Sequence, residues 1–305
     1  MNAPELLRRV QTNWSGALKR LRRARQVQPP VDWRRAGFFA AAGLAFVVFV
    51  AIAYDARAIA WSQTLSPAVR GFFGWITRFG RSGWLLVPSA AVVVVVSLGD
   101  WRRVSRAAAA AWWEIATFAA VLFAVVAVSG IITDIIKPIV GRSRPEYAEG
   151  GVIALTPLSF GGYPHYSFPS GHATTMAAVA VLAAFVPSVI TVPVVVAAAT
   201  VAISRVIIDA HFPSDVAGGT MVGLAVGYLI LRWMKSAGLV FVNRTDGTSR
   251  GRFGVLRRLA RTHGLSFLFP ALWLALGLGR QPPPTDAANA ASRSEIRSSG
   301  SSSPM

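Results

Sequence analysis

Three short runs of this chain, far apart in the sequence, contain residue types that handle phosphate. They are Lys137 to Pro145, Pro169 to His172, and Ser204 to Asp215, and each lies at the edge of a long apolar stretch. Three of their cations, two imidazoles and one carboxylate are the candidate site groups. Cations that hold the equatorial phosphoryl oxygens, beside an imidazole that attacks phosphorus, are the parts that phosphoryl transfer needs. The pattern therefore indicates phosphoryl transfer.

The third run holds the candidate nucleophile. His211 and Asp215 are four residues apart, which brings an imidazole and a carboxylate within reach of each other. A carboxylate on one ring nitrogen fixes the tautomer and leaves the other nitrogen's lone pair free to attack phosphorus. The alternative is that Ser214 or Asp215 caps a helix that begins just after Pro213. The two roles are compatible, and capping does not account for the histidine.

The second run holds the candidate proton donor. His172 follows Pro169, Ser170 and Gly171 at the start of an apolar segment. A helix N-terminus offers free N–H groups and a positive dipole end to a phosphate oxygen, and Gly171 lets the backbone approach closely. We predict that His172 protonates the leaving oxygen. Taken alone, a histidine at a helix start is more often a cap or an interface residue.

The candidate phosphate-binding cations are Lys137, Arg144 and Arg205. Charged groups within or bordering membrane spans are costly and usually mark a functional site. Arg144 and Arg205 can hold phosphoryl oxygens bidentately, with Lys137 as a point charge. The alternative for each is that the side chain snorkels to the membrane interface. For Arg142, between two of these cations, snorkelling is the interpretation we adopt.

The composition favours lipid as the solvent. The chain has 305 residues, of which 53% are hydrophobic and 14% charged, against about 25% charged in soluble domains. A net charge of +18 is typical of nucleic-acid-binding proteins, but the basic residues cluster at the two ends and in short loops, as membrane orientation requires. We therefore expect no nucleic-acid partner. With no cysteine in the chain, thiol catalysis, disulfides and cysteine metal ligands are excluded.

Six apolar segments predict a polytopic, all-α bundle of six transmembrane helices, since a spanning helix needs roughly 20 apolar residues. The segments are residues 37–54, 83–98, 108–132, 169–187, 190–208 and 215–233. Peripheral amphipathic helices are expected as well. The periodicity from Leu6 to Val27 predicts either a basic helix lying on an anionic leaflet or a partly disordered basic tail. Residues 57–79 predict an interfacial helix.

The predicted organisation has four parts. They are a basic N-terminal segment (1–36), a six-span domain (37–233), a basic interfacial segment (234–279) and a disordered tail (280–305). The first span is expected to be an uncleaved anchor rather than a signal peptide. The apolar run 265–278 is too short to span confidently and is expected to lie at the interface.

Basic residues set the predicted orientation. They concentrate before the first span, after the second and after the sixth, and the positive-inside rule makes that side cytoplasmic. Both termini are then inside. The loop 133–168 and the turn 209–214, which carry the motifs, face outward.

The combination Lys-x6-Arg-Pro, Ser-Gly-His and Ser-Arg-x5-His-x3-Asp resembles the type 2 phosphatidic acid phosphatase superfamily, which also contains vanadium haloperoxidases. The resemblance covers about residues 37–233, with every signature position filled. It implies a six-helix core, a phosphohistidine at His211 oriented by Asp215, His172 as proton donor, and no metal or other cofactor. It also implies a phosphate held by Lys137, Arg144, Ser170, Gly171 and Arg205. Asp209 falls where many members carry a small residue, and the sequence assigns it no role.

We therefore predict an integral membrane phosphatase that removes a terminal phosphate from a lipid phosphate or pyrophosphate at the outer face of a bacterial cytoplasmic membrane. Candidate substrates are phosphatidate, phosphatidylglycerol phosphate, undecaprenyl diphosphate and a lipid A phosphate, among which the sequence gives no basis for choice. The basic termini are expected to contact anionic lipids. Two alternatives are a vanadate-dependent haloperoxidase, disfavoured by the six spans, and a non-catalytic lipid-binding protein, disfavoured by the complete motifs. The sequence does not indicate an oligomeric state.

Overall fold

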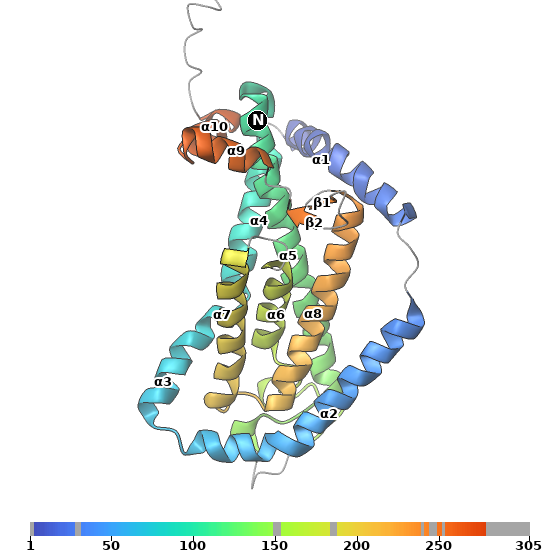
Figure 1. The fold of residues 1–305 in the computed structure, drawn as a ribbon, viewed down its shortest axis with the longest axis vertical. Coiled ribbons are helices and arrows are strands. Elements are labelled where there is room, and N and C mark those ends of the chain that lie inside the picture. Colours follow the sequence, from blue (N-terminus) through green and yellow to red (C-terminus); the bar gives the residue numbers. More distant parts are fainter. Residues whose placement is uncertain are drawn as a thin grey trace, which may run out of the picture.

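The bundle of helices is elongated, and its two ends differ (Figure 1). The structure, a computed structural model, describes residues 3–27, 32–148, 154–183, 188–238, 241–243, 249–251 and 254–278. One end, called the loop end below, is formed by residues 141–148 and 154–170 and by the turn 208–212. The opposite end, called the tail end, carries α1 (Ala3–Val27), α9 (Gly254–His263) and α10 (Leu268–Ala275).

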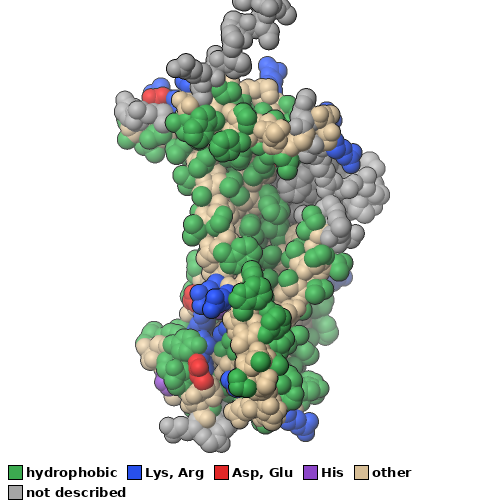
Figure 2. Space-filling view, turned by 90° about the vertical axis from the view of Figure 1, so that its left-hand side faces the viewer, with side chains coloured by type: hydrophobic (Ala, Val, Ile, Leu, Met, Phe, Trp, Pro, Cys, Tyr) green, Lys and Arg blue, Asp and Glu red, His purple; other side chains and the backbone are tan. Residues whose placement is uncertain are grey.

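The helices between these ends confirm the predicted helical bundle. They are α2 (Trp33–Gln63), α4 (Gly83–Leu98), α5 (Arg106–Val140), α6 (Gly171–Ala183), α7 (Ser188–Ile207) and α8 (Pro213–Ser236). Within the described residues, five segments are long and apolar enough to cross a membrane, namely Trp33–Gln63, Pro67–Leu98, Arg106–Val140, Ile190–Ile207 and Pro213–Ser236. The described part of α6 is shorter than these. Hydrophobic side chains cover most of the flank between the two ends (Figure 2).

The helix bounds follow the predicted spans closely where an apolar run is uninterrupted, and α4 coincides with the predicted span 83–98. The predicted interfacial helix 57–79 is wrong in its first part, because α2 continues through Gln63. The remainder forms α3 (Pro67–Ile76) and the short 3-10 helix η1 (Thr77–Gly80). Ser66 starts α3 by accepting a hydrogen bond from the Val69 N–H, and Pro67 suits the first helical turn.

Gly141 ends α5 and turns the chain into the first motif. Its φ is +58°, a left-handed conformation that favours glycine, and its N–H donates to the Lys137 carbonyl at 2.8 Å. A Cβ at this position would lie 1.8 Å from the Thr156 carbonyl oxygen. The residues that follow therefore cross the loop end close to the chain at 154–156, where Ser143 N–H donates to the Ala154 carbonyl at 2.9 Å.

Two glycines let α8 and α6 pack closely. A Cβ on Gly219 or on Gly223 would lie 2.3 Å from the carbonyl oxygen of Ser170 or of Thr174, respectively. Small residues four apart on one helix face allow this approach inside a membrane bundle. The Ser170 N–H in turn donates to the Asp215 carbonyl at 3.0 Å. The second and third motifs are thus joined through the backbone.

At the tail end, the N-terminal segment is helical, as in the first of its two predicted alternatives. Trp14 on α1 donates through Nε1 to Ser97 Oγ at 2.6 Å. Glu114 of α5 accepts from the N–H groups of Val255 and Leu256 and so caps the start of α9. A small antiparallel hairpin of β1 (Phe241–Asn243) and β2 (Ser249–Gly251) departs from the all-α prediction. The predicted tail 280–305 lies outside the described residues.

Candidate active site

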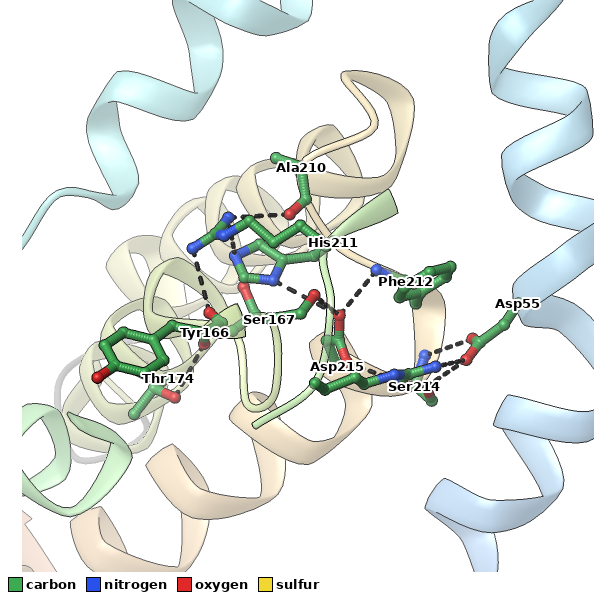
Figure 3. A network of polar contacts seen from close by, with 12 residues as sticks. Asp55, Tyr166, Ser167, Thr174, Ala210, His211, Phe212, Ser214 and Asp215 are labelled. Carbon is green, nitrogen blue, oxygen red and sulfur yellow. Dashed lines mark hydrogen bonds and ion pairs between the residues drawn. The ribbon is translucent and has the colours of Figure 1, made fainter. Parts of the chain in front are cut away.

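His211 lies at the loop end, in the turn between α7 and α8, and its side chain is 2% exposed. Its Nδ1 faces Asp215 Oδ2 at 3.6 Å (Figure 3), which is an electrostatic contact too long for a hydrogen bond. Asp215 Oδ2 also accepts from the Phe212 N–H at 2.9 Å and from Ser167 Oγ at 2.5 Å. The carboxylate therefore both caps α8 and faces the imidazole.

The other ring nitrogen of His211 faces Arg144, whose Nη1 lies 3.3 Å from Nε2. Because a guanidinium only donates, Nε2 carries the lone pair and Nδ1 carries the proton that points toward Asp215. Arg144 also donates to the carbonyls of Ala210, Tyr163 and Tyr166 at 2.9, 3.0 and 3.2 Å. Its guanidinium lies 3.8 Å from the centre of the Tyr163 ring. This cation is therefore fixed beside the imidazole.

Burial keeps the His211 imidazole neutral. It lowers the pKa of His211 from 6.5 to about 4, an effect that the charges of Arg144 and Arg205 reinforce and that Asp215 opposes. Burial also lowers the pKa of Arg144, against the opposing influence of Tyr163. At neutral pH the Nε2 lone pair of His211 is thus available, which is the condition for a nucleophilic imidazole.

Arg205 brings a second guanidinium to the same region. Its Nη1 donates to Thr77 Oγ1 of η1 at 2.8 Å. Its Nε is buried and, among the described residues, has no hydrogen-bond partner, and the same holds for Ser170 Oγ. His172 lies within electrostatic range of both Arg205 and His211. Buried polar atoms without partners are uncommon in folded proteins, and they are suited to a polar ligand.

Lys137 lies in the last turn of α5 and points toward the start of α6. A Cβ on Gly171 would lie 3.7 Å from Lys137 Nζ, which also pairs with Asp134 Oδ1 at 2.7 Å. The structure therefore brings all the predicted site residues to the loop end of the bundle. They are Lys137, Arg144, Ser170, Gly171, His172, Arg205, His211 and Asp215.

Arg142 corrects the interpretation drawn from the sequence. Instead of snorkelling to an interface, its side chain is buried, donating to Asp55 Oδ2 and to Asp215 Oδ1, each at 2.6 Å. Nη1 donates to Ser214 Oγ at the same distance. The reason is that two carboxylates from different helices reach this point, and a buried cation is stable only when it is paired and hydrogen-bonded.

Asp55 of α2 is the residue that the sequence analysis missed. It is fully buried and accepts from the N–H and Oγ of Ser214, at 2.9 and 2.5 Å, in addition to Arg142 (Figure 3). Its signal in the sequence is a carboxylate inside a long apolar helix, which is costly without a function. The predicted first span ended one residue earlier, at Tyr54, and hid this signal.

Asp209, which had no predicted role, connects the nucleophile turn to two other elements. Its backbone is left-handed, with φ +56°. Its carboxylate pairs with Arg70 of α3 at 2.7 Å and accepts a short hydrogen bond from Ser62 of α2. The turn that carries His211 is therefore anchored to α2 and α3 as well as to α8.

No group of three or more histidine, aspartate or glutamate side chains suited to hold a metal ion occurs in the part of the chain that the structure describes. The positive charge around His211 comes from lysine and arginine side chains.

Comparisons with known proteins identify the family of this chain. The model of the PAP2 superfamily matches residues 118–238. A lipid A 1-phosphatase of Rhizobium johnstonii is 30% identical over 251 residues, which are 82% of this chain and 98% of that protein. A lipid A 1-phosphatase of Rhizobium etli is 29% identical over 221 residues, or 72% and 92% of the two chains.

Two further proteins show more distant similarity to this chain. A decaprenylphosphoryl-5-phosphoribose phosphatase of Mycobacterium tuberculosis is 31% identical over 157 residues, covering 51% of this chain and 75% of that protein. The crystal structure of a transmembrane PAP2-type phosphatidylglycerolphosphate phosphatase from Bacillus subtilis superposes with a TM-score of 0.46 at 21% identity, covering 64% of this chain and 95% of that one.

The apolar helices and these relatives define a multi-pass membrane protein. The chain belongs to the PAP2 superfamily, the family that its three motifs predicted.

Proposed function

We propose that this protein is a membrane phosphatase that removes a terminal phosphate from a lipid phosphate through a phosphohistidine at His211. The observation that carries the proposal is the environment of the His211 ring. Nδ1 faces the carboxylate of Asp215, and Nε2, which holds the lone pair, faces the cation of Arg144. A neutral, oriented imidazole beside fixed cations is the arrangement that attack on a phosphate ester requires.

In the first step, His211 Nε2 attacks phosphorus, so a P–N bond forms while the P–O bond to the lipid breaks. His172 donates a proton to the departing oxygen, which leaves as an alcohol or as a lipid phosphate. The phosphoryl oxygens are held by Lys137, Arg144, Arg205, Ser170 and the N–H groups at the start of α6, including Gly171. Asp215 stabilises the imidazolium that forms on His211.

In the second step, the neutral His172 takes a proton from a water molecule that attacks the phosphohistidine. The P–N bond breaks, its electron pair returns to Nε2, and inorganic phosphate leaves with the transferred oxygen. His172 is then protonated for the next cycle. We propose that the reaction is independent of metal ions, because three basic side chains supply the positive charge that stabilises the transition state.

For the substrate, we propose the 1-phosphate of lipid A ahead of phosphatidate, phosphatidylglycerol phosphate and undecaprenyl diphosphate. The two lipid A 1-phosphatases support this order, since this chain covers 98% and 92% of their lengths. The test is phosphate release by the purified protein in detergent from each of these four lipids. Highest kcat/KM on lipid A 1-phosphate is expected. No release from any of the four would contradict the proposed activity.

We further propose that residues 37–233 form the catalytic domain in a bacterial inner membrane, with the loop end outside and both termini in the cytoplasm. The basic helices α1 and α9 lie at the tail end, opposite the loop end (Figure 1), which supports this orientation by the positive-inside rule. We also expect these helices to bind anionic lipids.

The absence of cysteine from the sequence makes this orientation simple to test. Single variants Ala154→Cys at the loop end and Ser15→Cys on α1, both at exposed positions, are labelled in intact cells with a membrane-impermeant maleimide. Labelling of Ala154→Cys alone is expected. Labelling of Ser15→Cys alone would reverse the orientation.

A further inference from the structure

The flank of the molecule beside the active site contains an apolar cavity of about 320 Å³, within the size range of small-ligand pockets. It lies between η1, α4, α6 and α7, and the side chains that define it here are Phe79, Trp84, Met176, Val179, Val194 and Val201. We call this cavity the flank groove. Figure 2 views this side of the molecule and shows basic side chains directly bordered by hydrophobic ones.

The groove is continuous with the active site along two helices. On α6, Met176 and Val179 follow His172 by four and seven residues, so they occupy the same helix face. On α7, Val201 and Val194 precede Arg205 by four and eleven residues, again on one face. Each helix therefore presents a phosphate-site side chain at the loop end and an apolar stripe extending from it.

A third element, η1, contacts both the active site and the flank groove. Thr77 accepts from Arg205 in the active site. A Cβ on Gly80 would lie 2.6 Å from the His172 ring and 2.7 Å from Val201, so the backbone of η1 packs directly where the active site meets the groove. At the rim of the groove, Trp84 Nε1 donates to the Phe79 carbonyl at 2.8 Å, which fixes the orientation of the indole.

The groove also has the dimensions of a hydrocarbon chain. From Arg205 to Val194 the stripe extends about 16 Å at 1.5 Å per residue. It runs along the flank, away from the loop end, because α7 leads from the loop end in the direction of the tail end (Figure 1). A molecule with an anionic head and a linear apolar tail matches this surface in both charge and length.

We propose that the flank groove binds one hydrocarbon chain of the lipid whose phosphate reacts at His211. This inference deepens the proposed function and rests on it. It makes the protein selective for amphiphilic phosphate esters, because the chain contributes binding energy that a water-soluble phosphate lacks. Membrane lipid that fills the groove regardless of its head group is the competing occupant.

Ala197 of α7 allows a direct test, because it lines the groove and is exposed. The change Ala197→Phe fills the groove, while Ala199→Phe adds the same volume at an exposed position of the same helix that does not line it. Both variants are assayed in detergent with phosphatidates that carry six-carbon or sixteen-carbon chains. The head group and the reacting bonds are then identical.

For Ala197→Phe we expect kcat/KM on the sixteen-carbon substrate to fall about tenfold or more, and on the six-carbon substrate to change less than about twofold. Ala199→Phe should leave both within about twofold of the unmodified protein. Equal effects of Ala197→Phe on the two substrates, or no effect on either, would overturn the proposal.

A binding measurement separates this proposal from the phosphatase activity. Phosphatidate and diacylglycerol, each with a diazirine in the chain, are photo-crosslinked to the protein, and the adducts are mapped by mass spectrometry. We expect adducts in the groove segments of α6 and α7 with phosphatidate only. If such adducts formed but the protein released no phosphate, binding of a hydrocarbon chain in the groove would be supported and the proposed phosphatase function would be overturned. Equal groove labelling by both lipids would identify general membrane lipid and overturn the groove proposal.

Discussion

Two groups of buried side chains around His211 differ in how completely their polar atoms are hydrogen-bonded. On the Nδ1 side, Asp215 and Asp55 are fully buried, and Arg142 joins their carboxylates with bonds of 2.6 Å. Elsewhere around the ring, Arg205 Nε and Ser170 Oγ are buried without a hydrogen-bond partner among the described residues, and His211 Nδ1 itself, 3.6 Å from Asp215 Oδ2, also lacks one. The first group is suited to hold the imidazole in one orientation. The second is suited to receive an anion.

This difference explains why the site combines charges that the membrane disfavours. A buried ion pair contributes little net stability, because desolvation offsets most of the Coulomb attraction, yet breaking one is costly. The network around Asp215 therefore fixes geometry more than it stabilises the fold. The unbonded donors of the second group cost free energy in the free protein, and a bound phosphate would recover it. Substitutions in the two groups should accordingly have different effects.

Replacement of His211 by alanine should have the largest effect. Since His211 is the proposed nucleophile, kcat should fall by at least about 10⁴-fold, as for nucleophiles that act as part of a unit. Phosphate release from the preferred lipid is the measurement. His165→Ala, a change in the loop that contacts Thr156, is the matched control and should keep near-normal activity. Comparable activity of the two variants would remove His211 from the mechanism.

Arg205→Ala should have the next largest effect, because it removes a guanidinium that we propose donates hydrogen bonds to the phosphate. A loss of about 10²- to 10³-fold in kcat is expected, as for removal of one preorganised donor to a transition state. Thr77→Val, which removes only the partner of Arg205 Nη1, should cost much less. If the two variants lose activity equally, positioning by η1 rather than charge on the phosphate is what matters.

Asp55→Asn tests the buried network of Asp55, Arg142 and Asp215. It leaves Arg142 with one carboxylate, so we expect a loss of about 10- to 100-fold in kcat from misplacement of the imidazole, with KM little changed. A destabilisation of about 3 kcal/mol should accompany it, measured by thermal unfolding in detergent. Asp134→Asn is the control, since the Asp134 side chain is 73% exposed and its pair with Lys137 should contribute little stability. Equal unfolding temperatures for the two variants would contradict a structural role for the Asp55 pair.

Asp209 lies at the edge of the network and should matter less. Asp209→Gly removes the pair with Arg70 and the hydrogen bond from Ser62 but tolerates φ +56°, and neither partner is a proposed phosphate ligand, so activity should change by less than about threefold. Asp209→Val should lower stability by a further 1 to 2 kcal/mol, roughly the cost of a left-handed backbone with a branched side chain. Thermal unfolding of the two variants is the measurement. A more stable valine variant would rule out the backbone argument.

The smallest expected change is in the protonation of His211 with pH. It tests directly whether the imidazole is buried. Because the pKa is lowered to about 4, the imidazole should stay neutral as pH falls from 8 to 5 and become charged only as pH falls through 4. At pH 5 only about a tenth of it is protonated, against most of an ordinary histidine with pKa 6.5. Nitrogen-15 NMR of histidine-labelled protein, with His211→Ala for assignment, measures this directly. A midpoint near 6.5 would contradict the buried environment.

Much of the architecture could be predicted from the sequence because lipid imposes strong local rules. The bounds of α4 coincide with the predicted span, and those of α7 and α8 differ from the predicted spans by only a few residues. The short spacing of His211 and Asp215 also predicted their proximity, and it arises because His211 lies in the turn just before α8 while Asp215 lies in the first turn of that helix. The roles assigned to them are predictions that the experiments above test.

The buried network could not be predicted, because its partners are distant in sequence. Asp55 and Arg142 are 87 residues apart, and only the packing of α2 beside α8 brings them together. Asp209 pairs with Arg70 for the same reason. The hairpin of β1 and β2 also gave no signal, since each strand has only three residues.

The central claim, a covalent phosphohistidine, is tested most directly by trapping it. The protein is mixed with lipid labelled with ³²P in the terminal phosphate, quenched in alkali within milliseconds, digested and mapped by mass spectrometry. We expect an alkali-stable, acid-labile phosphate on His211 that is absent from His211→Ala. Turnover with no labelled protein at any quench time, or a label on another residue, would contradict it.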